Sequence, residues 1–392
     1  MKRSGWQWLA LLLSLVLLAG CGEAEAPAPE SAAPAPTETA APTPPVLETA
    51  EPSPTPEATE AVEEQTLVLW LAEDAPLCES LEALAEDYCA QYPERLLRVF
   101  RFSDEDELSL ALAQGRPDLL LCSGGQAAAL AAEGKLSASI AKEAALPLRP
   151  YFQSAPEGFF PLGGELPVLA VKEENRALLP EGGSLEDFCA QAEDYARRYG
   201  RPYFSADSFA VLLAGTLAQK GSPFYAMREM DLESEAFQEI YNMLAGSAFE
   251  GGLVLLDEPV LPAVERGDLI CGICSSRELL DGAAEGIAVL PLPPMAGCEA
   301  LTESTLWGLA APEGAPDAAA DFIAWLYAQS GTTEAALDAG LLPAAESGWE
   351  AVERFTAVLE ECRICCSTED SGFVHNGVYF EQSFRAALAL LG

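Results

Sequence analysis

The chain has 392 residues and a formal net charge of −41 at pH 7, because 62 acidic residues outnumber 21 basic ones. Nucleic acid and anionic lipid are poor partners for such an acidic surface. The acidic residues either favour a cationic ligand or only keep the exterior solvated and the protein soluble. The chain has a single histidine, His375, so most catalytic sites built on histidine cannot form. We therefore expect no enzyme activity, no cofactor and no metal.

Residues 1–20 have the layout of an export signal, with a basic start followed by an apolar run from Leu9 to Leu18. The run is too short to span a membrane, which takes about 20 apolar residues. Its ending, Leu18-Ala19-Gly20-Cys21, resembles the lipobox of bacterial lipoproteins, which implies cleavage before Cys21 and diacylation of that residue. A short, capped core helix is the alternative. We therefore expect a protein anchored by lipid on the extracellular face of the cell membrane.

Residues 21–65 consist almost wholly of Pro, Ala, Glu and Thr and contain no Lys or Arg. Such a segment has almost nothing to bury and stays disordered or polyproline-like. At about 3.1 Å per residue, its extended reach is on the order of 100 Å. We interpret it as a tether that lets a folded domain stand clear of the membrane.

The folded region opens with strands that alternate with helices. Apolar runs predict strands at 67–71, 96–102 and 118–122. Helical periodicity and capping residues predict helices at 76–91, from Ser103 to Gln114, and from Ser123 to Gly134. Three such units in succession call for a parallel sheet with helices on both faces.

Ligands of parallel sheets lie beyond the carboxyl ends of the strands. This rule places Trp70, Glu73 and Asp74 after the first predicted strand. It places Ser123 and Gly124 after the third strand, beside Gln126. We expect these residues to line one edge of a cleft.

A second α/β unit follows. Strands are predicted at 167–171, near Leu269 and near Ile287, and helices at 184–200, 208–220 and 233–245. A strand predicted at 305–311 and a helix predicted at 317–329 then form another strand–helix unit like those at the start of the folded region. These returns predict two lobes joined by several crossings: 66–167 with 300–340 form lobe 1, and 168–299 with 341–392 form lobe 2.

The eleven cysteines lie mostly inside apolar patterns, as Cys78, Cys89, Cys122 and Cys189 do, where a free thiol behaves as a small apolar group. Cys271-Gly-Ile-Cys274 has the spacing of a redox pair. It falls in a strand-like run, however, where an odd spacing directs the two side chains to opposite faces.

The run Cys362-Arg-Ile-Cys365-Cys366 is a second cysteine cluster. It has no partner pair with zinc-site spacing, so structural thiols or a local disulfide are favoured over a soft-metal clamp. A thiol oxidoreductase stays an alternative that requires an exposed thiol of low pKa.

The order of segments resembles the extracellular solute-binding proteins of bacterial ABC importers, in particular the large group (family 1) that includes sugar binders. The matching segments are Leu67 to Trp70, Gln91 to Pro93, Pro117 to Leu120, Ala132 to Leu136, Leu166 to Leu169, Ser184 to Phe188, Val264 to Asp268, Val289 to Pro293 and Ala318 to Leu326. The resemblance implies an α/β, periplasmic-binding-protein-like fold of type II. It also implies that two lobes close about a hinge on a small ligand and that the protein, as a monomer, delivers the ligand to an ABC permease.

Carried onto this chain, the ligand lies between the loops after Trp70 and Ser123, the 203–207 strand and residues 302–307. Sugars need flat apolar platforms and carboxylates or amides for their hydroxyls. The candidate ligand-binding residues are Trp70, Glu73, Asp74, Ser123, Gly124, Asp207, Tyr225, Thr305 and Trp307. Many relatives carry a Tyr-Asn-Lys run where this chain has Leu169-Ala170-Val171-Lys172.

Two alternatives to a neutral carbohydrate remain open. A cationic ligand such as a polyamine would be held by Glu73, Asp74 or Asp207. The same fold also serves non-transport surface binding or sensing, because function depends on the site and its partners.

Overall fold

The computed structural model describes residues 65–140, 146, 148–222, 225–226, 229–230, 232–280, 282, 285–345, 350–365, 380–387 and 389–390. Residues 64–392 form one compact unit. The expected signal, Cys21 and nearly all of the expected tether lie outside the described residues. Within the described part, no helix has both the length and the apolar character that crossing a membrane requires.

The larger sheet has six strands in the order β12-β4-β11-β3-β1-β2. They are β1 (Gln65–Ala72), β2 (Arg95–Phe102), β3 (Leu119–Ser123), β4 (Phe159–Glu165), β11 (Thr305–Ala310) and β12 (Leu342–Pro343). The three expected strands are parallel, with β1 between β2 and β3. β11 enters between β3 and β4 and is antiparallel to both. The sheet is therefore mixed, and the expectation of a parallel sheet holds only for its first three strands.

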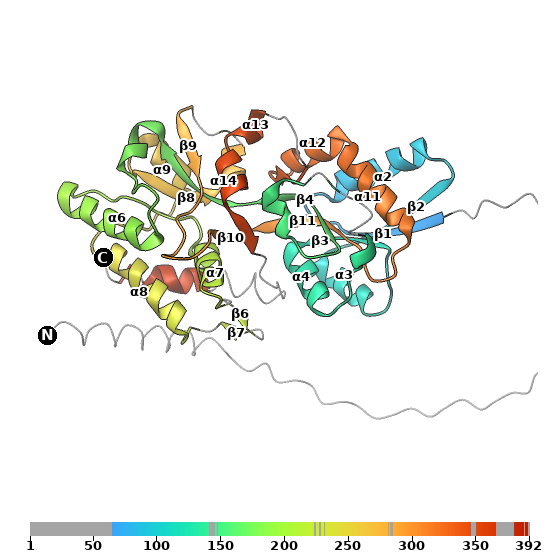
Figure 1. Cartoon of the computed structure of the whole chain (residues 1–392), viewed down its shortest axis with the longest axis horizontal. Helices are drawn as coiled ribbons and strands as arrows, with labels where there is room; N and C mark the ends of the chain where they lie inside the picture. Colours follow the sequence, from blue (N-terminus) through green and yellow to red (C-terminus); the bar gives the residue numbers. More distant parts are fainter. Residues whose placement is uncertain are drawn as a thin grey trace, which may run out of the picture. The chain divides into compact units, whose positions relative to one another are not determined.

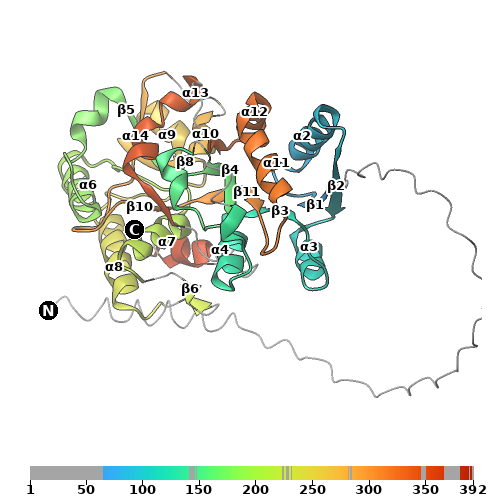
Figure 2. The ribbon, with the colours of Figure 1, turned by 45° about the vertical axis from the view of Figure 1, so that its right-hand side comes forward.

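Helices cover both faces of this sheet (Figures 1 and 2). They are α2 (Cys78–Gln91), α11 (Asp317–Ala328) and α12 (Ser330–Asp338) on one face, and α3 (Glu105–Leu112) and α4 (Gly124–Ala132) on the other. Aromatic rings join α2 to α11, since the ring centroid of Tyr88 lies 5.0 Å from that of Phe322 and 5.2 Å from that of Trp325.

The first turn of α3 is capped by Asp104, not by Ser103 as predicted. The Asp104 carboxylate accepts the Glu107 N–H at 2.8 Å, while Ser103 donates its own N–H to the Glu107 side chain at 2.8 Å. Asp104 has the extended backbone of an N-cap, with φ −161° and ψ 175°, and accepts the N–H three residues on, so the helix begins one residue later than predicted.

The smaller sheet has three antiparallel strands in the order β8-β5-β9, namely β5 (Pro167–Lys172), β8 (Cys271–Ser275) and β9 (Ile287–Leu290). The helices of this part are α6 (Leu185–Tyr199), α7 (Phe209–Gln219), α8 (Glu235–Phe249), α9 (Val260–Arg266) and α10 (Ser276–Leu280). α6 begins and ends as predicted, with a capping box between Ser184 and Asp187 and with Gly200 in the left-handed conformation at φ 65°.

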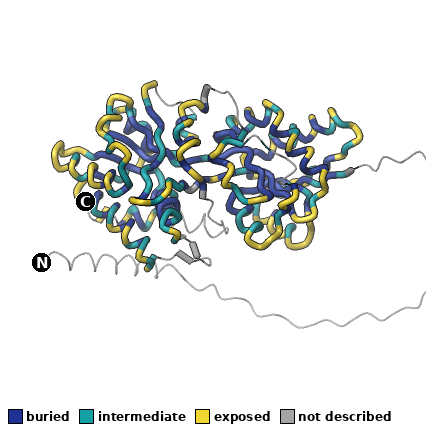
Figure 3. Tube along the Cα trace, in the orientation of Figure 1, coloured by how far each residue is buried: buried dark blue, intermediate teal, exposed yellow. Residues whose placement is uncertain are grey.

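The remaining short elements are η1 (Pro150–Ser154), η2 (Glu173–Leu178), β6 (Tyr225–Ala226), β7 (Glu229–Met230), β10 (Leu301–Glu303), α13 (Glu350–Glu353), α14 (Thr356–Glu361) and β13 (Arg363–Cys365). Much of the two sheets is buried (Figure 3), whereas only one residue of the edge strand β2, Leu97, is buried. Leu67, Leu69 and Leu71 alternate along β1 and are at most 2% exposed, as expected for side chains on the covered face of a strand.

The chain crosses from the larger sheet to the smaller one at Leu166, between β4 and β5. Leu166 donates its N–H to Ser276 Oγ at 3.0 Å, and Ser276 returns its own N–H to the Leu166 carbonyl at 2.7 Å. Both residues are fully buried. These two hydrogen bonds tie the crossing to the first residue of α10. The expected lobe boundaries and hinge remain predictions.

Candidate functional site

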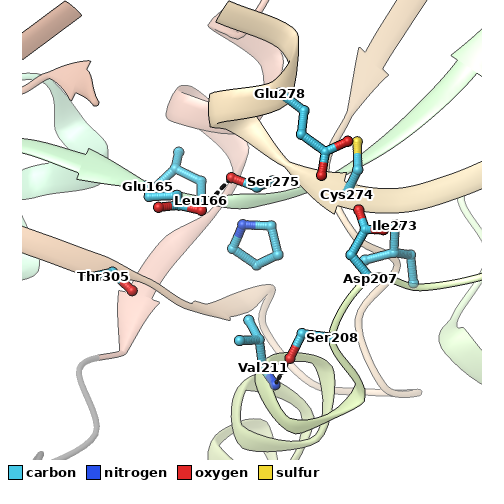
Figure 4. A pocket seen from close by; sticks show the side chains of 11 residues that line it. Glu165, Leu166, Asp207, Ser208, Val211, Ile273, Cys274, Ser275, Glu278 and Thr305 are labelled. Carbon is cyan, nitrogen blue, oxygen red and sulfur yellow. Dashed lines mark hydrogen bonds between the residues drawn. The ribbon is translucent and has the colours of Figure 1, made fainter. Parts of the chain in front are cut away.

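A pocket of about 300 Å³ lies at this crossing (Figure 4). Its lining consists of Glu165, Leu166, Pro167, Asp207, Ser208, Val211, Ile273, Cys274, Ser275, Glu278 and Thr305. The volume is at the lower end of the range of ligand pockets, which favours a small ligand.

Both sheets supply the walls. Glu165 ends β4 and pairs in register with Thr305, the first residue of β11, so the two side chains share one face of the larger sheet. Ile273, Cys274 and Ser275 end β8 of the smaller sheet, and Glu278 follows on α10. The pocket therefore draws its groups from segments that are far apart in the sequence.

Three carboxylates enter the pocket from three different segments. Glu165 accepts the Ser275 hydroxyl at 2.5 Å. Asp207 accepts the N–H of Val260, the first residue of α9, through Oδ1 at 2.8 Å. The positive end of the α9 dipole favours a negative charge there. Both carboxylates are thus held in place by the protein.

The second oxygen of Asp207, Oδ2, is buried and receives no N–H or hydroxyl donor from the described residues. The neighbouring carboxyl is that of Glu278. Burial and the charge of Asp207 raise the pKa of Glu278 to about 7. Burial also raises the pKa of Asp207, although the Val260 N–H lowers it in part. At neutral pH Glu278 therefore holds a proton for much of the time, and that proton supplies the bond that Oδ2 lacks.

The cation that acts on Asp207 is Arg385, which is not among the residues that line the pocket. Arg385 donates to the carbonyls of Ala206 and Asp207 and to Glu381 Oε1 at 2.7 Å. Glu381 in turn accepts the N–H groups of Phe209 and Ala210 at the start of α7. Arg385 is thus neutralised by Glu381 and fixes the loop that carries Asp207. Among the described residues that line the pocket there is no Lys, Arg or His.

Two of the predicted site residues, Asp207 and Thr305, line this pocket. Trp307 lies two residues along β11 from Thr305, on the same face of the strand, and is half-buried. It pairs in register with Ser123, which is buried and caps α4 by accepting the Gln126 N–H at 3.2 Å. Gly124 is the buried first residue of α4. The structure therefore places Ser123 and Trp307 on the pocket side of the sheet.

The other predicted residues lie apart from this lining. The Trp70 ring packs against Phe102, with centroids 5.1 Å apart. Glu73 and Asp74 are exposed in the turn after β1. The Tyr225 backbone belongs to β6, but its side chain lies outside the described part. A role of these four residues in binding a ligand stays a prediction.

Sequence reasoning missed Glu165, Ser275 and Glu278. A position at the end of a strand is the signal that could have found the first two, and Glu278 follows three residues after Ser275. Nothing local in the sequence says that residues 165 and 275 meet.

The cysteines show no redox pair in the described residues. Cys271 and Cys274 are buried and free, and burial raises the pKa of both thiols, which disfavours the thiolate. Cys362 is also buried and free, with its pKa raised to about 11 by burial. The side chains of Cys365 and Cys366, and His375, lie outside the described residues. Within the described ranges no three His, Cys, Asp or Glu side chains are placed to hold a metal ion.

Comparison with solved structures identifies the fold. The chain superposes on the cyclic alpha-maltosyl-1,6-maltose binding protein of Arthrobacter globiformis with a TM-score of 0.57 at 16% identity, covering 83% of this chain and 94% of that one. An extracellular solute-binding protein of family 1 from Alicyclobacillus acidocaldarius gives 0.60 at 15% identity, with 83% and 98% covered. UgpB of Mycobacterium tuberculosis, in complex with glycerophosphocholine, gives 0.53 at 17% identity, with 83% and 96% covered.

These neighbours define the class of fold: the chain is an α/β protein with the periplasmic-binding-protein fold of solute-binding proteins, as predicted. No family model matches the sequence. No curated protein matches it either. At these identities the likeness establishes the fold, and the solute has to be argued from the pocket.

Proposed function

We propose that this protein is the solute-binding component of an ABC importer and that it captures a small carbohydrate in the pocket at the crossing of its two sheets. The observation that carries the proposal is the position of the pocket, which takes residues from both sheets and from the strand that joins them. In this position a bound solute contacts both parts of the fold at once.

The chemistry of the lining supports a polyhydroxylated solute. Carboxylates accept hydrogen bonds from sugar hydroxyls, and Ser208 and Thr305 supply hydroxyls that both donate and accept. Trp307, on the same face of β11 as Thr305, offers an aromatic surface beside the pocket. Among the structural neighbours, one binds a cyclic maltosyl-maltose and another was solved with maltose.

The rest of the proposal concerns location and partners. Diacylation of Cys21 would hold the protein on the extracellular face of the membrane, and the Pro-rich segment would tether it within reach of a permease. Replacing Cys21 by Ser should abolish labelling with a fatty-acid probe in cells. Labelling of the variant would contradict the anchor.

A binding screen tests the function. Calorimetric titration with mono- and oligosaccharides should yield at least one carbohydrate that also raises the melting temperature, because a ligand of the folded state stabilises it. Asp207→Asn should weaken that ligand about tenfold, since it removes one charged acceptor. Asp194→Asn is the matched control, because it removes a carboxylate on α6 that is 61% exposed and is not among the residues that line the pocket. If both variants bind the ligand with equal affinity, this pocket is not its binding site.

A further inference from the structure

We infer that the carbohydrate taken by this pocket carries a basic amino group, which is held among Glu165, Asp207 and Glu278. The inference rests on the proposed function and names the class of sugar. Three carboxylates line a pocket of about 300 Å³, and none of the described residues that line it is basic. A neutral solute would displace water from these groups and leave the charges of Glu165 and Asp207 without a cation beside them. An ammonium group compensates the charge.

The spacing of the carboxylates favours an organic cation over a metal ion. Glu165, Asp207 and Glu278 come from β4, from the loop before α7 and from α10, and no three such groups in the described part are close enough to ligate a metal. An ammonium group has three N–H donors and a substituent that spaces it from the walls. Its N···O distances of about 2.8 Å exceed metal–oxygen distances of about 2.0–2.6 Å, so the acceptors around an ammonium group stand farther apart than the ligands of a metal.

The receiving groups are already ordered. Asp207 is fixed through Oδ1 by Val260 N–H, and Glu165 through Oε1 by Ser275, whose hydroxyl oxygen also accepts the Arg277 N–H at 3.0 Å. Asp207 Oδ2 is the buried acceptor that no N–H or hydroxyl of the described residues satisfies. An ammonium hydrogen of the solute takes the place of the proton that Glu278 otherwise offers to Oδ2.

This exchange links solute binding to proton release. The groups that face Glu278 are Asp207, Glu165 and the neutral thiol of Cys274. Behind them, Arg385 and Glu381 offset one another. On the α10 side, Arg277 is exposed, and Arg354 donates to the Leu279 carbonyl. The solute brings a positive charge, Glu278 ionises, and its proton passes to the buffer.

Calorimetry with matched sugars tests the inference. The probes are the glucosamine disaccharide with free amines, its N-acetylated counterpart, maltose and putrescine, titrated at pH 6 in buffers of different ionisation enthalpy. We expect the free-amine disaccharide to bind about tenfold tighter than the acetylated one and to release about one proton per ligand. In Glu278→Gln the proton release should vanish, and the advantage of the free amine should shrink. Glu174→Gln, which removes an exposed carboxylate elsewhere, should behave as the wild type.

The outcomes separate the inference from the function on which it rests. If the acetylated disaccharide or maltose binds as tightly as the free-amine sugar, the inference is wrong and the proposed function stands. Binding of putrescine alone overturns both, since the site would then select a cation without a sugar. Binding of the free-amine sugar with the same proton release in Glu278→Gln overturns the assigned role of Glu278. Failure of every probe to bind counts against the inference.

Discussion

At the scale of single residues, the Asp207–Glu278 pair decides how the pocket responds to pH. The two carboxyl groups lie together in a partly buried site, where both cannot ionise without a cost. Asp207 has the Val260 N–H and the α9 dipole to stabilise its charge, and Glu278 has neither. The proton therefore stays on Glu278 until neutral pH.

The raised pKa of Glu278 predicts how stability depends on pH. Unfolded, this carboxyl loses its proton near its ordinary value of 4.5, whereas in the folded protein it holds the proton up to about 7. The free energy of unfolding should therefore fall as pH rises from 4.5 towards 7. The Glu278→Gln variant lacks this loss. Its free energy of unfolding should therefore exceed that of the wild type by about 1–2 kcal/mol at pH 8, a value reduced because the carboxyl is partly exposed, and the two should be equal near pH 4.5.

Urea unfolding of both proteins between pH 5 and pH 8 measures the difference. Glu174→Gln, at a side chain 76% exposed, should keep the wild-type profile. Parallel curves for Glu278→Gln and the wild type would show that the pKa of Glu278 in the folded protein is ordinary.

Only part of the pocket could be predicted from the sequence. Asp207 and Thr305 were predicted because the resemblance to solute-binding proteins placed the ligand beside the 203–207 strand and residues 302–307. Glu165 and Ser275 are 110 residues apart, and their contact exists only once β4, β5 and β8 have assembled. Local patterns contain no trace of that contact, and two of the three carboxylates, Glu165 and Glu278, were not predicted.

At the scale of elements, helices with complete local signals were predicted closely, and strands without such signals were missed. α6 has an N-terminal capping box and a C-terminal glycine, and its observed bounds follow these residues. β4 has Pro161, Gly163 and Gly164 within seven residues, which disfavour a strand locally. It forms nonetheless because β11 and β12 pair on its two sides.

The packing of β4 against β11 predicts a strong effect of one methyl group. A Cβ on Gly308 would lie 2.2 Å from the Phe160 carbonyl oxygen and 2.7 Å from the Pro161 Cα. These are backbone atoms of a neighbouring strand and cannot turn aside. Gly308→Ala should therefore lower the free energy of unfolding by about 3 kcal/mol or more.

The matched control for this change is Gly331→Ala on α12. There the new Cβ would meet only the end of the Leu84 side chain, at 3.3 Å, and alanine favours a helix. Its midpoint of unfolding in urea should stay close to that of the wild type. A similar midpoint for Gly308→Ala would mean that the two strands pack less closely than described.

At the scale of the whole molecule, the excess of acidic residues acts as a diffuse repulsion. The net charge is −41, so repulsion between acidic groups lowers the stability of the folded chain. Salt should raise that stability, because the Debye length shortens to about 8 Å near physiological ionic strength and the repulsion is screened. We predict that the melting temperature at pH 7 rises as sodium chloride increases from about 20 mM to about 300 mM.

The control for the salt effect is the same measurement near pH 4.1, the isoelectric point calculated from the sequence. The net charge is then close to zero, so added salt should change the melting temperature little. A rise of the same size at both pH values would assign the effect to something other than repulsion between acidic groups.

The crossing at Leu166 has a consequence for how such a protein can diverge. Glu165 presents its side chain to the pocket, its carbonyl accepts Ser304 Oγ at 3.0 Å, and the next amide is bound by Ser276. A side chain of the pocket wall and the connection between the sheets are therefore encoded in adjacent codons, and a mutation at 165 acts on both. Asp207 has a structural task of its own, because its carboxylate accepts the N–H of Val260 at the start of α9. Glu278 and Thr305 stand on other elements and escape these constraints, so a lineage that adapts to a new solute is free to change these two positions first.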